Sequence, residues 1–268
     1  PFERNILDTE KIKTLENVAI VTGGAGGIGS VISKTLADKG TAICISDSDN
    51  KKSKALEKEI NSKGGTAIAV SSDVTSAKSI NNAVETVISH FGQIDALIYC
   101  AGNNVKAPIL DITLEQWKSS LDTHLTGAFL FCQAVGKKMI EQGNGGKIIL
   151  MSSVAATQPV PERGAYTPSK AGLIGLAKLL SLEWAQYNIN TNAVCPGVTT
   201  TPMTEMVYKR DPELKNQRLK RMPMRREIHP QEIADLVAFL CSNHSTSING
   251  TAITIDGGFV NSGFLPEA

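Results

Sequence analysis

The residues of this 268-residue chain that could do chemistry together are Ser153, Tyr166 and Lys170. Because Tyr166 and Lys170 are four residues apart, a helix would place them on one face, one turn from each other. A phenol with its ordinary pKa of about 10 is a poor base at neutral pH, but a neighbouring ammonium favours the phenolate and lowers that pKa. The Ser153 hydroxyl could hold a substrate oxygen while charge develops on it. Together the three side chains predict proton transfer to or from an alcohol or a carbonyl.

A second motif, near the N-terminus, predicts a nucleotide site. A β-branched run at 17–22 leads into a glycine-rich turn, Gly23 to Gly29, and then a helical pattern through Lys39. The glycines fit two registers, GxGxxG from Gly24 and GxxxGxG from Gly23. In either register the bare backbone can approach a pyrophosphate, which the helix N-terminus then binds. The next apolar run ends at Asp47, eighteen residues after Gly29, where a carboxylate would hold ribose hydroxyls.

The elements that must position these residues follow a regular rhythm. Short apolar runs alternate with helical patterns, and we expect strands near 17–22, 41–46, 66–70, 94–98, 146–151, 189–194 and 251–255. This alternation is typical of an α/β protein, a single-domain doubly wound (Rossmann) parallel sheet with helices on both faces. No linker or repeat divides the chain. We therefore expect an N-terminal extension at 1–14 and one catalytic domain at 15–268.

Composition narrows the possible functions. A net charge of +1 gives no general case for nucleic acid or for a membrane surface. No segment is apolar and long enough to be a membrane span, and no signal segment opens the chain. The five cysteines have no CxxC spacing, which favours reduced thiols in a cytoplasmic protein and predicts neither a disulfide nor a metal site.

With these motifs in view, the sequence resembles the short-chain dehydrogenase/reductase family from about Leu15 to Phe259. The family's TGxxxGxG begins here at Thr22, its adenine-pocket Asp-Val is Asp73-Val74, and its Pro-Gly after the sixth strand is Pro196-Gly197. Its serine and YxxxK are Ser153 and Tyr166 to Lys170. By resemblance, the cofactor contacts are Thr22, Gly23, Gly27, Ile28, Gly29, Asp47, Asp73, Val74, Ala101, Gly102, Tyr166, Lys170, Pro196, Gly197, Val198 and Thr201.

The resemblance also implies a reaction, hydride transfer between a substrate carbon and a nicotinamide ring. Tyr166 would exchange the proton, Lys170 would lower its pKa and hold a ribose hydroxyl, and Ser153 would orient the substrate oxygen. The family is typically tetrameric, which implies a homotetramer here.

Two positions depart from the family pattern. The usual Asn-Asn-Ala-Gly is Tyr99-Cys100-Ala101-Gly102, which suggests a different local support for the strand. The usual asparagine of Asn-x-x-Gly, which helps hold a water leading from the lysine, is His124. An imidazole can donate and accept, and it titrates near physiological pH. His124 is therefore a candidate catalytic relay, with a purely structural role as the alternative.

Asp47 predicts the cofactor, because its charge would repel a 2′-phosphate and bonds well to free ribose hydroxyls. NAD is therefore expected rather than NADP. No basic residue stands at Ala25, Gly26 or Ser48 to bind a phosphate.

The substrate is expected to lie beneath a covering segment at about 198–227 and beside the loop that carries Gln158 and Arg163. Eight basic residues between Lys209 and Arg226 form either a solvated face or an attraction for an anionic substrate. With Ser153, Gln158, Arg163 and Tyr166 as substrate contacts, a small polar substrate is favoured: a sugar acid, a polyol or a hydroxy acid. The alternatives are a 3-oxoacyl-carrier-protein reductase and, from another class, a non-catalytic nucleotide-sensing protein on the same fold.

Overall fold

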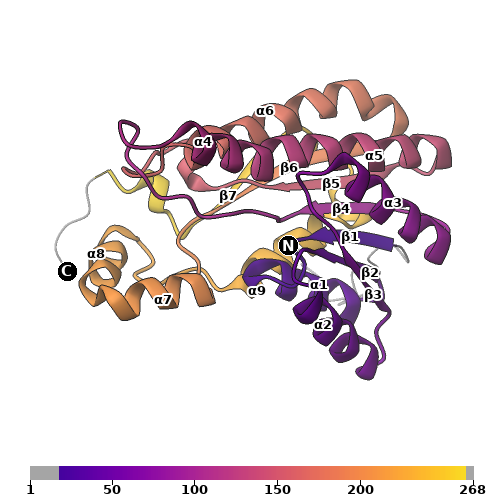
Figure 1. Ribbon diagram of the computed structural model, residues 1–268, viewed down its shortest axis with the longest axis horizontal. Coiled ribbons are helices and arrows are strands. Elements are labelled where there is room, and N and C mark those ends of the chain that lie inside the picture. Colours follow the sequence, from indigo (N-terminus) through magenta and orange to yellow (C-terminus); the bar gives the residue numbers. More distant parts are fainter. Residues whose placement is uncertain (1–17, 264–268) are drawn as a thin grey trace, which may run out of the picture.

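A parallel sheet lies between two helix layers in the computed structural model, which describes residues 18–263 (Figure 1). Its seven strands run in the order β3-β2-β1-β4-β5-β6-β7. Their bounds are β1 Val18–Thr22, β2 Ala42–Asp47, β3 Ala67–Ser71, β4 Ala96–Tyr99, β5 Gly146–Met151, β6 Ile189–Pro196 and β7 Ala252–Ile255. Every neighbouring pair is parallel. The expected strands and the doubly wound fold are confirmed.

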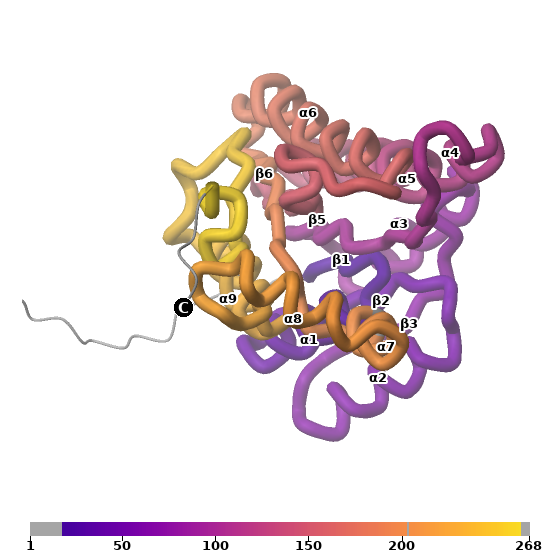
Figure 2. Tube along the Cα trace, turned by 90° about the vertical axis from the view of Figure 1, so that its left-hand side faces the viewer, coloured from indigo at the N-terminus to yellow at the C-terminus, as the bar shows by residue number. Residues whose placement is uncertain are grey.

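The strands are mostly apolar because helices cover both faces of the sheet. Ile32 and Val237 belong to the core on one face, and Phe131 and Leu173 belong to the core on the other. In Figure 2 the sheet lies between α1 and α2 on one side and α5 and α6 on the other. The helices of these layers are α1 Gly27–Asp38, α2 Asn50–Ser62 and α9 Pro230–Leu240, and then α3 Ala77–Phe91, α5 Gly127–Gln142 and α6 Tyr166–Trp184.

The strand order reverses between β1 and β4, the point at which open α/β sheets bind ligands beyond the carboxyl ends of their strands. Three shorter helices lie outside the two main layers. They are α4, Leu114–Leu121, and the pair α7, Pro202–Arg210, and α8, Pro212–Arg221. The pair follows β6 and stands apart at the left of Figure 1. It occupies the segment that was expected to cover the substrate.

Several further expectations concern the whole chain. Within residues 18–263, no helix has both the length and the apolarity needed to cross a bilayer. All five cysteines are free thiols, and all but Cys100 are buried. The described part of the chain holds no cluster of three or more side chains suited to a metal ion. The expected N-terminal extension at 1–14, and residues 15–17 and 264–268 of the expected domain, lie outside the described residues.

Candidate active site

The glycine-rich turn joins β1 to α1, and its glycines have steric reasons to be there. Gly23 has a φ of +60°, which side chains rarely adopt. A Cβ on Gly29 would lie 2.2 Å from the Gly23 carbonyl oxygen, so the helix can pack against the turn only without one. Gly26 is the N-cap of α1, and no side chain caps this helix. The uncapped N-terminus at Gly27 and Ile28 is therefore suited to a phosphate.

Asp47 lies at the carboxyl end of β2, beside this turn. Its Oδ2 accepts a hydrogen bond from the Ala25 backbone N–H at 3.0 Å, and its Oδ1 accepts one from Asp49 at 3.0 Å. These bonds hold the carboxylate against the glycine-rich turn. The neighbouring Ser48 adds no positive charge.

Other expected cofactor residues converge on the same edge of the sheet. Thr22 Oγ1 accepts hydrogen bonds from the backbone N–H groups of Cys100 and Ala101, at 3.1 and 3.2 Å, which ties β1 to the end of β4. A Cβ on Gly27 would lie 3.3 Å from Thr201, which brings the start of α7 to the start of α1. The Thr201 hydroxyl is itself occupied in capping α7.

The remaining expected contacts have local structural partners. Asp73 Oδ1 accepts from the Thr75 hydroxyl at 2.7 Å and from its N–H, and these bonds lower the pKa of that carboxyl. The Val74 carbonyl packs against Gly127. Pro196 ends β6, and Gly197 and Val198 follow it. A Cβ on Gly197 would lie 2.8 Å from Asp256, so the chain can pass that residue only as glycine.

The three expected catalytic side chains come together from two elements. Ser153 follows β5, and its Oγ accepts from the Ala155 N–H at 3.1 Å. Tyr166 is the first residue of α6, and Lys170 lies one turn further on, with its Nζ 5.6 Å from the centre of the Tyr166 ring. The Lys170 ammonium donates to the Met151 carbonyl oxygen at 2.8 Å. The end of β5 and the start of α6 thereby hold the three groups together.

Burial changes the expected electrostatics. It raises the pKa of Tyr166, while a hydrogen bond with Ser153 and the charge of Arg163 act in the opposite direction. Burial also lowers the pKa of Lys170 to about 8. The expectation that the Tyr166 pKa lies below its ordinary value is therefore wrong for this arrangement. Desolvation of the phenol outweighs the other effects, and the ammonium is directed to Met151 rather than to the phenol oxygen.

His124 lies in a π-helical turn, Asp122–Thr126, between α4 and α5. Its side chain is only 1% exposed, and its ring meets the Tyr166 ring edge-on at 5.4 Å. The Nε2 atom lies 3.0 Å from the Asn103 carbonyl oxygen and 3.3 Å from the Asn103 backbone N, so it can donate to the first or accept from the second. Nδ1 is buried without a hydrogen-bond partner among the described residues. Such π-turns are frequent at functional sites.

Tyr99 stands where the family usually has an asparagine, and it holds the π-helical turn that carries His124 in place. The Tyr99 hydroxyl donates to the Thr123 carbonyl oxygen at 2.6 Å, which ties the end of β4 to the residue before His124. Gly102 leaves room for the imidazole, because a Cβ there would lie 2.7 Å from His124 Cε1.

The expectation that His124 titrates near physiological pH is wrong. Burial, with a smaller contribution from the Lys170 charge, lowers the pKa of His124 to about 3. The imidazole is therefore neutral at any ordinary working pH, and it can act only through hydrogen bonds.

The expected substrate residues lie on the loop between Ser153 and Tyr166. Arg163 donates to the Asn104 amide oxygen, and its guanidinium carbon lies 5.4 Å from the centre of the Tyr166 ring. Gln158 Oε1 is buried without a hydrogen-bond partner in the described part of the chain. Asn104 was not among the residues expected from the sequence. No local pattern marks it, because its partner Arg163 lies 59 residues further along the chain.

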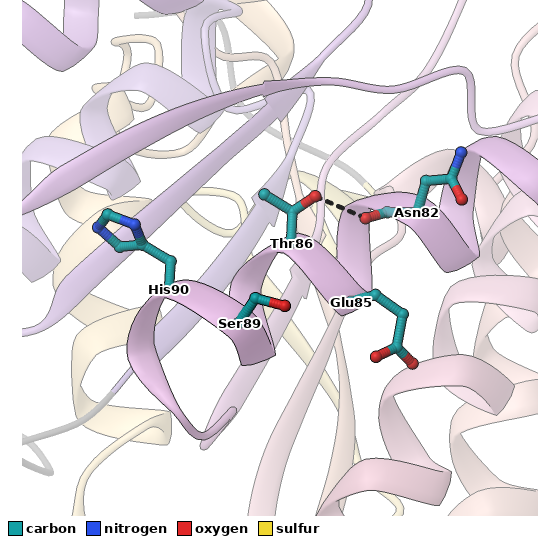
Figure 3. A pocket seen from close by; sticks show the side chains of 5 residues that line it. All are labelled: Asn82, Glu85, Thr86, Ser89 and His90. Carbon is teal, nitrogen blue, oxygen red and sulfur yellow. Dashed lines mark hydrogen bonds between the residues drawn. The ribbon is translucent and has the colours of Figure 1, made fainter.

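A shallow hollow of about 470 Å³ lies elsewhere, on the outer side of α3. Figure 3 shows the residues that line it: Asn82, Glu85, Thr86, Ser89 and His90. Since α3 runs back from the carboxyl ends of the strands towards their amino ends, its last turn lies at the opposite edge of the sheet from Tyr166. The hollow therefore takes no part in the site described above.

Comparison with known proteins places the chain among reductases and dehydrogenases. A family model described as Enoyl-(Acyl carrier protein) reductase matches residues 23–260. The chain is similar to the D-threitol dehydrogenase of Mycolicibacterium smegmatis, with 38% identity over 90% of this chain and 92% of the relative. It is also similar to a 3-oxoacyl-(acyl-carrier-protein) reductase of Aquifex aeolicus, with 36% identity over 92% of this chain and 99% of the relative. Among solved structures, the acetoin dehydrogenase from Enterobacter cloacae matches with a TM-score of 0.84 and 36% identity, over 94% of this chain and 99% of that one.

Proposed function

The chain belongs to the short-chain dehydrogenase/reductase family and is an oxidoreductase of alcohol or ketone substrates, and from that premise we propose that it uses NAD and acts on a small polar secondary alcohol or its ketone. A sugar acid, a polyol and a hydroxy acid are the substrate types in question. The observation that carries the proposal is the meeting of Ser153, Tyr166 and Lys170 at the edge of the sheet where the glycine-rich turn also lies.

The residues at this edge fit a dinucleotide. The helix N-terminus at Gly27 has no side-chain cap and suits a pyrophosphate, and Asp47 presents a carboxylate beside the turn that suits two free ribose hydroxyls. The same carboxylate would repel a 2′-phosphate, which supports NAD over NADP. When bound, the nicotinamide supplies or accepts the hydride.

The protein side chains manage the proton and the substrate oxygen. In the direction of reduction, Tyr166 donates its phenol proton to the carbonyl oxygen as that oxygen gains negative charge, and Ser153 donates a hydrogen bond to the same oxygen. In oxidation, Tyr166 takes the proton back. A phenol whose pKa is raised by burial keeps its proton at neutral pH, which suits it to the donor role. Lys170 lies one turn along α6, where its charge stabilises the phenolate left behind.

His124 is proposed as a neutral relay residue beside this group. The imidazole touches the Tyr166 ring and keeps Nδ1 without a partner among the described residues, so one ring nitrogen is available to a water or a substrate hydroxyl. A histidine with a pKa of about 3 does not gain a charge in this role.

A carrier-protein ketoreductase is the second candidate within the enzyme class. Its support is the similarity to the Aquifex aeolicus reductase, together with the basic residues of α7 and α8, which could meet an acidic carrier. The proposed NAD preference argues against it, because biosynthetic reductases usually take NADPH. A non-catalytic nucleotide sensor has less support, since Ser153, Tyr166 and Lys170 are all present and in contact.

A homotetramer and a cytoplasmic location complete the proposal. The apolar side chains of Leu179 and Leu182 on α6 are 51% and 80% exposed, which suits them to a subunit interface. The free cysteines suit a reducing compartment. Sedimentation of the purified protein at several concentrations tests the assembly.

The function is tested by a substrate screen. Purified protein with NAD is offered sugar acids, polyols, hydroxy acids and secondary alcohols, and NADH formation is followed by absorbance. Tyr166→Phe run in parallel identifies turnover that depends on this site. Turnover that is equal in both proteins, or that requires NADP, would contradict the proposal.

A further inference from the structure

The ring of Tyr166 has a cation beside it from each of two elements. The Nζ atom of Lys170, one turn along α6, lies 5.6 Å from the ring centre. The guanidinium carbon of Arg163, on the loop before α6, lies 5.4 Å from the same point. Both are within the range of about 6 Å in which a cation interacts with an aromatic ring. Since a nearby cation favours a phenolate over a phenol, Arg163 lies where its charge can act on the group that exchanges the proton.

The loop that carries Arg163 is held in place by a second loop. The Ala107 backbone N–H donates to the Glu162 carbonyl oxygen at 3.2 Å, and the Gly164 N–H donates to the Ala107 carbonyl oxygen at 3.2 Å. The Arg163 guanidinium donates to the amide oxygen of Asn104, which belongs to the same second loop. Contacts of both backbone and side chain therefore fix the position of the guanidinium.

The charge of Arg163 is not cancelled by a carboxylate. None of the ion pairs found within residues 18–263 includes Arg163, and its side-chain partner Asn104 is neutral. The charges of Glu162, on the same loop, and of Arg218, on α8, shift the pKa of Arg163 in opposite directions. The guanidinium therefore presents an uncompensated positive charge to the Tyr166 ring.

The two cations respond differently to pH. Burial lowers the pKa of Lys170 to about 8, so its ammonium loses its proton in mildly alkaline solution. Burial lowers the pKa of Arg163 as well, but from a starting value of 12.5, and a guanidinium stays charged in proteins. His124, whose ring meets the Tyr166 ring edge-on, is neutral at these pH values. Above about pH 8, Arg163 is therefore the cation that remains of the pair.

We propose that Arg163 is a second cationic partner of Tyr166, whose guanidinium stabilises the phenolate and thereby sustains alcohol oxidation in alkaline solution. In oxidation the phenolate accepts the hydroxyl proton of the alcohol, while the carbinol carbon gives up its hydride to the nicotinamide. Arg163 exchanges no proton itself and acts through Tyr166, so it is a positioning residue. This inference rests on the proposed function, because it concerns the tyrosine of the same site.

Fluorine NMR of protein labelled with 3-fluorotyrosine follows the ionisation of each phenol and needs no turnover. The Tyr166 signal is the one that is missing from Tyr166→Phe. Arg163→Gln removes the charge but keeps a side chain that can donate to Asn104. It is expected to raise the pH midpoint of the Tyr166 signal by at least about 0.5 unit. Arg163→Lys keeps a charge and is expected to recover at least about half of that shift.

Two further variants separate the charge from the fold. Asn104→Asp places a carboxylate on the guanidinium while keeping the shape of an exposed side chain, so it should raise the Tyr166 midpoint as Arg163→Gln does. Arg221→Gln is the matched control. It makes the same substitution at an arginine that lies over another ring, 5.0 Å from the centre of Phe259, and should leave the midpoint within about 0.2 unit.

Kinetics measure the consequence for turnover, with an alcohol and its ketone identified by the substrate screen. In Arg163→Gln, kcat for oxidation at pH 9 is expected to fall at least about threefold, because less of the phenol is ionised. The kcat for reduction at pH 6, where the phenol is protonated in both proteins, should stay within about twofold. The two rates are taken on one preparation, so a loss of folded protein cancels in their ratio.

The outcomes distinguish this inference from the proposed function. If no alcohol is turned over, the proposed function is refuted, and the fluorine signal still decides the inference. If Arg163→Gln does not fold, Asn104→Asp supplies the comparison. Three results would overturn the inference while leaving the function intact: a Tyr166 midpoint that neither variant moves, an equal shift in Arg221→Gln, or an unchanged ratio of oxidation to reduction.

Discussion

The neutral state of His124 has a measurable consequence for stability. In an unfolded chain its imidazole has a pKa of about 6.5, whereas in the folded protein burial lowers that pKa to about 3. Between these two values the unfolded state binds a proton that the folded state does not. Stability contributed by the buried neutral ring is therefore present above pH 6.5 and is lost as the pH falls towards 3.

The size of the effect follows from that shift. One pKa unit corresponds to about 1.36 kcal/mol, and pH 5.0 lies about 1.5 units below the unfolded value, so the expected loss at pH 5.0 is about 2 kcal/mol. At pH 7.5 the loss of stability from this titration is close to zero. His124→Asn removes the titration while keeping a side chain that can donate and accept hydrogen bonds. Between pH 7.5 and 5.0 the wild type should therefore lose about 2 kcal/mol more of its free energy of unfolding than His124→Asn loses.

Urea unfolding of both proteins at pH 7.5 and 5.0, at one protein concentration, measures this difference. His90→Asn, the same substitution at an exposed histidine, is the matched control. The pH–rate profile of the wild type should also lack an inflection that belongs to His124 between pH 6 and 7. A pH-independent difference between wild type and His124→Asn, or an NMR titration of His124 near pH 6.5, would refute the reasoning.

Three further substitutions test the site. Tyr166→Phe should lower turnover at least about a hundredfold with little change in cofactor affinity, measured by steady-state kinetics and NADH fluorescence; residual activity above about a tenth of wild type would exclude Tyr166 as the proton donor. Lys170→Ala should weaken both turnover and NAD binding. It should also abolish the change in rate near pH 8, where the Lys170 ammonium loses its proton. An unaltered pH–rate profile together with unaltered NAD affinity would contradict the role of Lys170. The wild type should prefer NAD to NADP by at least about tenfold in kcat/KM, roughly 1.4 kcal/mol, and Asp47→Ala should shrink that ratio; equal use of both by the wild type would argue against Asp47 as the selector.

The sequence was most informative where chemistry depends on neighbours in the chain. The glycine-rich turn could be read from Gly23 to Gly29 because one strand, one turn and one helix N-terminus are consecutive. Tyr166 and Lys170 could be placed on one helix face for the same reason. The alternation of apolar runs predicted the strands, since a parallel strand covered on both faces must be apolar along its length.

Burial and long-range contacts limited what could be predicted about the site. His124 was expected to titrate near neutral pH, but its exposure depends on Gly102, Asn103 and Tyr166 packing around it. The pKa of Tyr166 was expected to fall, and the desolvation that raises it comes from the folded chain as a whole. The spacing of apolar residues along the sequence gives no measure of the burial of His124 or of the desolvation of Tyr166.

The sequence by itself determined the doubly wound sheet, the glycine-rich turn and the Ser153, Tyr166 and Lys170 group, because these follow from short-range patterns. Only the tertiary structure decided the electrostatics of that group and the approach of Arg163 and His124 to the Tyr166 ring. The physical reason is that desolvation and charge–charge interaction depend on distance in space. Residues far apart in the chain reach that distance only when the helices and loops have packed onto the sheet.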